Sequence, residues 1–438
     1  MKQLLQITML GLAIFLFSCV EELRPENDRF IKIYGKESGS FGSGLYEYPN
    51  GNILIGGKVD VPALDFTNTG GVFDIGKVIE GSIATISLDA NGNQIAMHPL
   101  PIATHPTVPQ IDFPNIEDKG RVNQILPTSD GGFMLLCEWR GIDIAFPEDD
   151  LYFPGDYNST TPFLVKLNNQ FYPEFVRSFN GEPGWDEVFR ARAKMKALPD
   201  GDIGILFGVN FYDFTPEGSL KGYSFLKLNS QGDTIFFRDF YDDRFAIKSA
   251  HDFVIDQKGW LTMIGQMNEK LYAIVRRGQN YDEELRAFLD SGGMGNEWNN
   301  NPMFIEEFSD GEYVVVYTDP PQDTRLQFFA LSESALGEEP EPIIISKLNR
   351  EFPRAVSITS NEDILIYTEH LTSATVPEGY LYRIDRNGKT KFRIRLEGTP
   401  GDVIESRDGT ILVLSNPLFN SLIPKTRLTK LSADGQLF

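Results

Sequence analysis

A short pattern recurs seven times along this chain, and it constrains the fold more than any single residue does. In each copy an alternating apolar run reaches a tight polar turn, a second apolar run follows, and a third run ends at another turn. In the first copy these turns are Pro49-Asn50-Gly51-Asn52 and Asp89-Ala90-Asn91-Gly92-Asn93. Alternation at every second residue predicts strands, and Asn-Gly between two such runs predicts a hairpin. Each copy is therefore expected to form a four-stranded antiparallel sheet.

The inner turn returns in all six later copies, and an apolar run follows it each time. These turns are Ser129-Asp130-Gly131-Gly132, Pro199-Asp200-Gly201-Asp202, Asp256-Gln257-Lys258-Gly259, Ser309-Asp310-Gly311-Glu312, Ser360-Asn361-Glu362-Asp363 and Arg407-Asp408-Gly409-Thr410. Glycine supplies the positive φ that a tight turn needs, and only the sixth copy lacks it. A repeat with a period of roughly 40–50 residues is typical of propellers and other repeat arrays.

The third run of several copies carries a Lys or Arg next to its final apolar residue. These cations are Lys166, Lys227, Arg383 and Lys430. We expect them to face outward from their strands. Helical periodicity is nearly absent, and the best helical candidate runs from Asp282 to Leu289.

The seventh copy is truncated, because it ends at Phe438 with no room for a complete fourth strand. An orphan run, Arg29-Phe30-Ile31-Lys32-Ile33-Tyr34-Gly35, matches the missing strand. A ring whose last blade takes its outer strand from the chain start has no open seam. The sequence therefore predicts an all-β fold, a seven-bladed β-propeller of four-stranded antiparallel blades closed by the N-terminal strand. Six or eight blades are the alternatives.

The repeat resembles a family of propeller-like surface lipoproteins of Bacteroidetes, in blades of the form apolar run, Asp-Gly turn, apolar run, Leu-x-Lys-Leu-Asp. The resemblance covers residues 29–438 and concerns architecture, because the family has no characterised activity. It implies a lipid anchor and one propeller domain.

The N-terminus has the features of a lipoprotein signal. Lys2 precedes an apolar stretch from Leu4 to Phe17, which is too short to span a membrane. Leu16-Phe17-Ser18-Cys19 resembles a lipobox, so we expect lipids on Cys19; the alternative is an ordinary signal peptide with an incidental cysteine. The expected organisation is a signal peptide (1–18), a lipidated tether (19–28) and a single propeller domain (29–438).

Charge and cysteine content limit the location and the partners. Val20-Glu21-Glu22 resembles the acidic stretch that directs such lipoproteins to the cell surface, with a periplasm-facing anchor in the outer membrane as the alternative. The net charge of −22 argues against nucleic acid as a partner. The remaining cysteine, Cys137, lies in an apolar run and is expected to be a small buried hydrophobe, so no disulfide framework forms.

Long segments between the predicted strands fall on one face of the expected ring. They cover 58–80, 98–120, 139–161, 209–221, 287–301 and 416–426. Long loops on a rigid scaffold are where binding usually resides, and aromatics suit stacking on sugars or anchoring a protein partner. The candidate aromatics are Phe66, Phe73, Phe146, Tyr152, Phe153, Tyr157, Trp185, Phe211, Tyr212, Phe214 and Trp298. Their burial under their own loops is the alternative.

The sequence contains few candidate catalytic or metal-binding residues. The four histidines (His98, His105, His251 and His370, the last expected in a loop) show no metal-ligand spacing, so we predict no metal site and no cofactor. Pairs such as Asp149-Asp150 could hold calcium, but solvated acidic loops account for them equally well. No nucleophile elbow, phosphate loop or dinucleotide fingerprint occurs.

The sequence therefore favours a non-catalytic envelope lipoprotein that binds a glycan or a protein. An accessory subunit of an outer-membrane transporter or secretion complex is the first alternative. A propeller glycosidase or lyase is the second.

Overall fold

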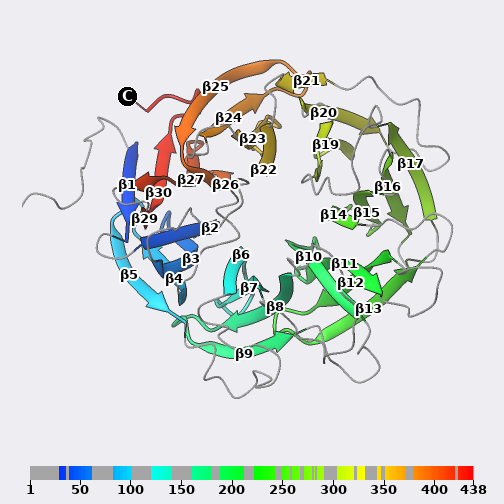
Figure 1. The fold of residues 1–438 in the computed structure, drawn as a ribbon, viewed down its shortest axis with the longest axis horizontal. Coiled ribbons are helices and arrows are strands. Elements are labelled where there is room, and N and C mark those ends of the chain that lie inside the picture. The colour runs from blue at the N-terminus through cyan, green and yellow to red at the C-terminus, as the bar shows by residue number, and fades with distance from the viewer. Residues whose placement is uncertain are drawn as a thin grey trace, which may run out of the picture.

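The described strands form seven four-stranded antiparallel sheets arranged in a ring (Figure 1). The computed structural model describes residues 29–35, 39–61, 82–100, 120–140, 160–178, 188–211, 221–241, 249–256, 259–266, 271–278, 281, 284–290, 303–319, 323–330, 343–346, 351–370, 378–419 and 423–437. The predicted class, an all-β propeller of four-stranded antiparallel blades, is confirmed. We number the blades in the order in which their first strands follow along the chain.

Each blade runs outward from the central axis in strand order. Blade 1 contains β2 (Gly39–Glu47), β3 (Ile53–Val61), β4 (Ser82–Leu88) and β5 (Gln94–Pro99). Blade 2 contains β6 (Gly120–Pro127), β7 (Phe133–Arg140), β8 (Thr160–Leu167) and β9 (Pro173–Ser178). Blade 3 contains β10 (Val188–Ala197), β11 (Ile203–Phe211), β12 (Lys221–Leu228) and β13 (Thr234–Tyr241). Blade 4 contains β14 (Ser249–Ile255), β15 (Leu261–Gln266), β16 (Leu271–Arg277) and β17 (Glu284–Asp290).

The second half of the ring follows the same plan. Blade 5 contains β18 (Phe304–Glu307), β19 (Glu312–Asp319), β20 (Asp323–Ala330) and β21 (Ile343–Ser346). Blade 6 contains β22 (Glu351–Ile358), β23 (Ile364–His370), β24 (Glu378–Ile384) and β25 (Thr390–Glu397). Blade 7 contains β26 (Thr399–Glu405), β27 (Ile411–Asn416), β30 (Thr426–Leu431) and β1 (Phe30–Tyr34). A small two-stranded sheet, β28 (Leu418–Phe419) with β29 (Ile423–Pro424), lies between β27 and β30 in the chain.

The hydrophobic core lies between the blades. Each core cluster takes its residues from two neighbouring blades, including one between blades 7 and 1. In β7, Phe133, Leu135 and Cys137 pack against blade 1, whereas Met134 and Leu136 pack against blade 3. Both faces of a middle strand are therefore buried, which explains why these strands are continuously apolar. Cys137 is buried as predicted, and burial raises the pKa of its thiol.

The N-terminal strand completes blade 7, as the sequence predicts. β1 pairs antiparallel with β30, and Phe30 lies opposite Lys430. The same strand also contacts blade 1: the Tyr34 hydroxyl donates to the Gly92 carbonyl at 2.8 Å, and Lys32 Nζ donates to Asn93 Oδ1 at 3.1 Å. β1 therefore holds the first and last blades of the ring together (Figure 1).

Three sequence-based expectations are wrong. The cations of the third strands do not face outward: the Lys166 side chain is 1% exposed and pairs with Asp130 of the inner turn. The best helical candidate, 282–289, does not form a helix in its described part, because Glu284–Asp290 is strand β17 and completes blade 4. His370 is the last residue of β23 and does not lie in a loop.

Candidate functional site

The two rims of the ring differ in how much chain they carry. We call the long rim the side where the chain passes from the second to the third strand of a blade and from one blade to the next. The opposite side is the short rim. Intervals between strands on the long rim include 62–81, 101–119, 141–159, 212–220 and 291–302. Inner and outer turns on the short rim include 48–52, 89–93, 128–132 and 168–172, and the exception is the interval 331–342 between β20 and β21.

The predicted binding aromatics lie almost entirely outside the described residues. Phe211 is the last residue of β11, at the long rim. The other ten candidates fall in segments that the structure does not describe, as does Cys19; they are Phe66, Phe73, Phe146, Tyr152, Phe153, Tyr157, Trp185, Tyr212, Phe214 and Trp298. The site that can be built from described side chains is therefore the central channel.

The innermost strands share a β-bulge at the same level of the channel. The register shifts between Gly42 and Gly44 in β2, Val122 and Gln124 in β6, Ala250 and Asp252 in β14, and Pro400 and Asp402 in β26. A bulge redirects the side chain that follows it, and bulges are frequent next to functional sites. In β6, β14 and β26 the residue after the bulge is polar and reaches the next blade, whereas β2 has Gly44 at this position.

These redirected side chains connect neighbouring blades. Gln124 Oε1 accepts from the Met195 amide at 2.7 Å, Asp252 Oδ2 from the Ile305 amide at 3.0 Å, and Asp402 Oδ2 from the Leu45 amide at 3.0 Å. Each acceptor is the residue directly after the bulge. Each donor is the residue one position further along the innermost strand of the next blade. We call this contact the bulge latch. The latch at Asp402 joins blade 7 to blade 1, so the ring is closed at its inner edge as well as at β1.

Burial strongly affects the Asp402 carboxyl. Desolvation raises its pKa to about 6, although the Val403 and Leu45 amides and the charge of Lys194 act in the opposite direction. Lys194, whose charge lowers this pKa, belongs to β10 of blade 3. The carboxyl therefore titrates near neutral pH.

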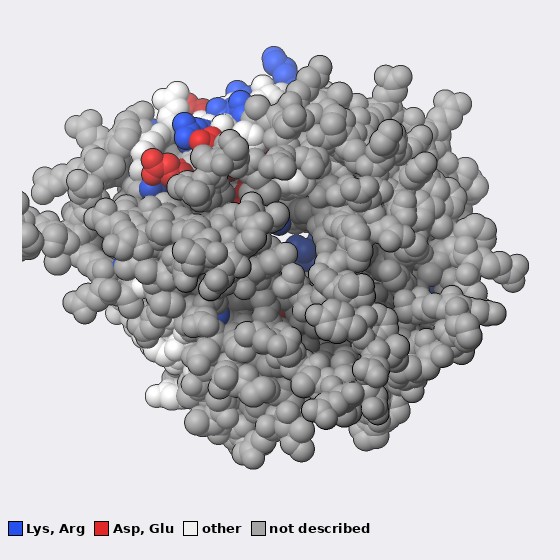
Figure 2. Space-filling model, viewed as in Figure 1, with Lys and Arg blue, Asp and Glu red and all other residues white. Residues whose placement is uncertain are grey.

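Two lysines of β10 supply positive charge to the channel. Lys196 Nζ lies 3.2 Å from Asp252 Oδ1 and 3.0 Å from Glu306 Oε1, so one lysine joins blades 3, 4 and 5. Burial lowers the pKa of Lys196, but these two carboxylates outweigh it and raise the pKa. Figure 2 shows a hollow at the centre of the ring with Lys or Arg side chains on its wall.

Lys194 differs from Lys196, because it has no ion-pair partner among the described residues. Its ammonium lies 4.8 Å from the centre of the Phe304 ring. A cation held against an aromatic face in a channel can bind an acidic or polar group of a ligand.

Two channel carboxylates, Asp402 and Asp252, are poorly placed for catalysis. A general acid or base needs an oxygen directed at substrate, yet Asp402 uses Oδ1 for the Val403 amide at 2.9 Å and Oδ2 for the Leu45 amide. Asp252 is occupied in the same way by the Phe253 and Ile305 amides. Within the described ranges, no three His, Cys, Asp or Glu side chains gather in a way that could hold a metal ion. Nor does that part of the chain contain a helix with the length and apolar character of a membrane span.

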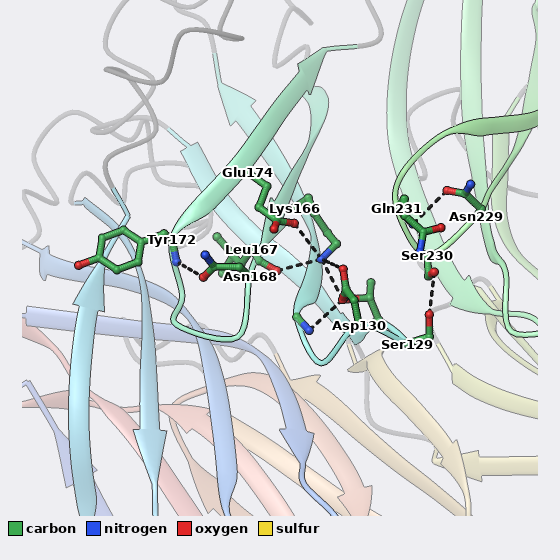
Figure 3. Close-up of polar contacts among 12 residues, drawn as sticks. Ser129, Asp130, Lys166, Leu167, Asn168, Tyr172, Glu174, Asn229, Ser230 and Gln231 are labelled. Atoms are coloured by element: carbon green, nitrogen blue, oxygen red, sulfur yellow. Dashed lines mark hydrogen bonds and ion pairs between the residues drawn. The ribbon is translucent and has the colours of Figure 1, made fainter.

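A second recurring arrangement occupies the short rim (Figure 3). Lys166 Nζ lies 2.8 Å from Asp130 Oδ2 and 3.2 Å from Glu174 Oε2, and it donates to the Leu167 carbonyl. Burial raises the pKa of Asp130, but hydrogen bonds from Lys166, Thr128 and the Gly132 amide lower it to about 2. The same pairing of turn and third strand joins Lys227 to Asp200, Arg383 to Asp363, and Lys430 to Asp408.

Blade 5 replaces this pair by a contact from its neighbour. Phe328 occupies the register position that Lys166 has in blade 2. Arg386, from the outer turn of blade 6, supplies the missing charge: it pairs with Asp310, Glu312 and Glu362 and lies 4.7 Å from the centre of the Phe308 ring. These short-rim pairs hold turns and blades together, so their role is structural.

Sequence reasoning missed the bulge latch and Lys194. A signal for the latch was present: Gln124, Asp252 and Asp402 each precede two apolar residues in the first strand of their repeat. Aligning the copies on the first strand, not on the inner turn, would have shown this polar position.

Several solved structures are similar to this chain. A protein of unknown function from Bacteroides caccae is 11% identical with a TM-score of 0.41, and the match covers 72% of this chain and 91% of that one. A protein of unknown function from Dyadobacter fermentans is 11% identical, with a TM-score of 0.44 and coverages of 90% and 95%. The WD40 domain of Toxoplasma gondii coronin is 8% identical, with a TM-score of 0.46 and coverages of 94% and 88%. No family model and no curated protein match the sequence. At these identities and TM-scores none of the similar structures carries an activity over to this chain.

Proposed function

We propose that this chain is a lipoprotein of the bacterial outer membrane, anchored through Cys19, whose seven-bladed propeller binds a glycan or a protein at its long rim. The inequality of the rims is the observation that carries the proposal. Turns on the short rim are mostly five residues long, whereas the long rim carries intervals such as 62–81 and 141–159. Extra chain on one side of a rigid scaffold is the usual arrangement of a binding face.

The chemistry of the rim and channel favours binding over turnover. The candidate aromatics lie in these intervals, and aromatic rings suit sugar faces and protein hot spots. Two channel carboxylates, Asp402 and Asp252, accept from backbone amides, which favours a structural role for them. We place the protein on the cell surface, with a periplasm-facing anchor as the alternative.

A binding experiment with matched rim variants tests the proposal. The mature chain is applied to a glycan array and to solubilised envelope proteins, alongside a long-rim variant (Tyr152→Ala with Phe153→Ala and Tyr157→Ala) and a short-rim control (Tyr172→Ala). We expect the long-rim variant to lose at least tenfold in affinity while the control binds normally. Equal binding by both variants would refute a long-rim site.

The same preparation separates the alternatives. Capture of an integral membrane protein in stoichiometric amount indicates the accessory-subunit role. Turnover of a polysaccharide that is lost in Glu306→Gln would show that the protein is an enzyme and would overturn the non-catalytic proposal.

A further inference from the structure

The large hydrophobic side chains that are exposed in the described part of the chain lie on one side of the ring. They are Ile95 (61% exposed), Tyr172 (66%) and Ile235 (52%). Ile95 is the second residue of β5, Tyr172 directly precedes β9, and Ile235 is the second residue of β13. All three therefore lie at the short rim, on the outermost strands of three consecutive blades.

The N-terminal tether joins the fold at this same rim. Phe30 begins β1 opposite Lys430, next to the outer turn of blade 7, and Arg29 Nη1 donates to the Gln436 carbonyl of that turn. Figure 1 shows β1, β5 and β9 following one another along the perimeter of the ring. The point where residues 19–28 attach is therefore beside the blades that carry the exposed apolar side chains.

The length of the tether decides which rim approaches the anchor. Residues 19–28 reach at most about 35 Å when fully extended, and a flexible chain of this length has a mean span of about 18 Å. A strand of eight residues already separates the rims by about 27 Å. Lipids on Cys19 would therefore favour an orientation with the short rim nearer the bilayer, because the tether joins the fold at that rim.

Two inner-turn carboxylates of the short rim are paired with lysines, whereas Asp233, two residues before Ile235, is exposed. Asp130 and Asp200 on blades 2 and 3 are paired with Lys166 and Lys227, so these turns do not present bare carboxylates to the lipid headgroups. Tyrosine favours the membrane interface, where its ring is apolar and its hydroxyl stays hydrated.

We infer that the short rim of blades 1, 2 and 3 lies against the bilayer, with Ile95, Tyr172 and Ile235 in the interfacial layer. This inference rests on the lipidation at Cys19 that is part of the proposed function. It assigns an orientation: the membrane supports the short rim, and the ligand is met at the long rim.

Fluorescence quenching in vesicles tests the orientation. The lipidated mature chain is placed in phosphatidylcholine vesicles that contain nitroxide-labelled lipid, with a fluorophore on a single introduced cysteine: Ile95→Cys, Tyr172→Cys or Ile235→Cys. The control is Pro99→Cys, an exposed position at the other end of β5. Cys137 is buried and does not take up the label. We expect at least twofold stronger quenching at the three short-rim positions than at position 99. Equal quenching, or stronger quenching at 99, would overturn the inference.

Flotation with the vesicles and the mass of the N-terminal peptide are measured on the same sample. Absence of lipid and of flotation would refute the anchor itself. Flotation without quenching at residues 95, 172 and 235 would leave the anchor intact and refute the orientation, as would happen if these side chains faced a partner protein. A variant with Ile95→Ser, Tyr172→Ser and Ile235→Ser, labelled through Asn91→Cys, should lose most of the quenching at position 91 while it still floats; unchanged quenching would contradict a role for these side chains.

Discussion

Lys166 shows how a charged residue can belong to the core of a propeller blade. Its ammonium is almost fully buried, yet it lies among the carboxylates of Asp130 and Glu174 and the Leu167 carbonyl. The inner turn and the third strand therefore stabilise each other, because the carboxylate of the turn neutralises the ammonium of the strand. Blade 1 has the neutral pair Asn50 and Ser87 at these two positions, which fits the same rule.

Removal of this buried charge should destabilise the fold. We expect Lys166→Ala to lower the free energy of unfolding by about 1–2 kcal/mol, because it removes the buried lysine stem and its hydrogen bonds to carboxylates that are themselves partly exposed. The exposed Lys389 provides the control, and Lys389→Ala should change the stability by no more than about 0.5 kcal/mol. Urea denaturation measures both, and equal midpoints for the two variants would contradict the role assigned to Lys166.

Asp402 should make the stability depend on pH in a defined direction. Its pKa is about 6 in the fold, above its ordinary value of 3.8, so the folded state holds the proton more tightly than the unfolded chain. The stability that this proton contributes is complete below pH 3.8 and is lost as the pH rises through about 6; the difference corresponds to about 3 kcal/mol. We expect the stability of the wild type relative to Asp402→Asn to fall by most of this amount between pH 4 and pH 7.5, measured by denaturant titration. Parallel pH profiles would show that this carboxyl does not titrate as proposed.

At the level of the strand and turn, one contact recurs between neighbouring blades. Each of the six described outer turns has a residue with positive φ, and the outermost strand of the previous blade packs on it. Phe30 covers Gly92 in this way, and Phe175 covers Gly232. In blade 2 the turn residue is Phe171, at a φ of 65°. On β5 of blade 1, the position that corresponds to Phe175 of β9 is occupied by the small Ala96. In blade 2 the large side chain is therefore on the turn and the small one is on the strand, the reverse of the arrangement at Gly232 and Phe175. The space between the blades stays filled in both cases.

A pair of glycine variants separates packing from backbone strain. Gly92 and Gly131 both have positive φ, but a Cβ at Gly92 would lie 2.5 Å from the Phe30 ring, whereas one at Gly131 would meet nothing within 4 Å. Gly131→Ala should cost about 1–2 kcal/mol from backbone strain alone, and Gly92→Ala should cost about 1–3 kcal/mol more from overpacking. The free energies of unfolding of the two variants decide the matter. A smaller loss at Gly92 would show that Phe30 moves aside without cost.

The whole ring depends on contacts between chain segments that are very distant in sequence. Blades 7 and 1 are joined by β1, by the latch from Asp402 to Leu45, and by Asn416, whose side chain bonds the Gly42 amide at 2.7 Å and the Gly42 carbonyl at 2.8 Å. Blades 7 and 1 are therefore connected at the outer edge of the ring, at the central channel and between these two levels. Burial of Phe30 and Tyr34 contributes about 1.5–3 kcal/mol for each side chain.

Truncations at the N-terminus measure this closure. Chains that begin at residues 20, 28 and 36 are compared by thermal unfolding. We expect the first two to have the same midpoint and the third to unfold several degrees lower, because it lacks β1 and leaves β30 with an unpaired edge. A common midpoint for all three chains would refute closure by the N-terminal strand.

The sequence predicted the parts of the fold that depend on local patterns. The Asn-Gly and Asp-Gly turns located the hairpins, and the orphan run at Phe30 identified the strand that completes blade 7. It could not predict the partner of Lys166, because alternation indicates which face a residue occupies but not what opposes it 36 residues away. The latch residues Asp252 and Asp402 were hidden for another reason: the bulges shift the alternation of the innermost strands. The predicted binding aromatics stay predictions, since the described strands carry only Phe211 among them.

Pairing of β1 with β30 also has a consequence for the order of folding. Arg29 and Gln436, whose contact belongs to this junction, are 407 residues apart. During synthesis β1 is made first, but it cannot pair until β30 has been made. The intervening blades can fold one after another before that. Contacts of such high sequence separation slow folding, so ring closure should be the late and slow step. Until then the two exposed strand edges are available to any chaperone that recognises extended chain.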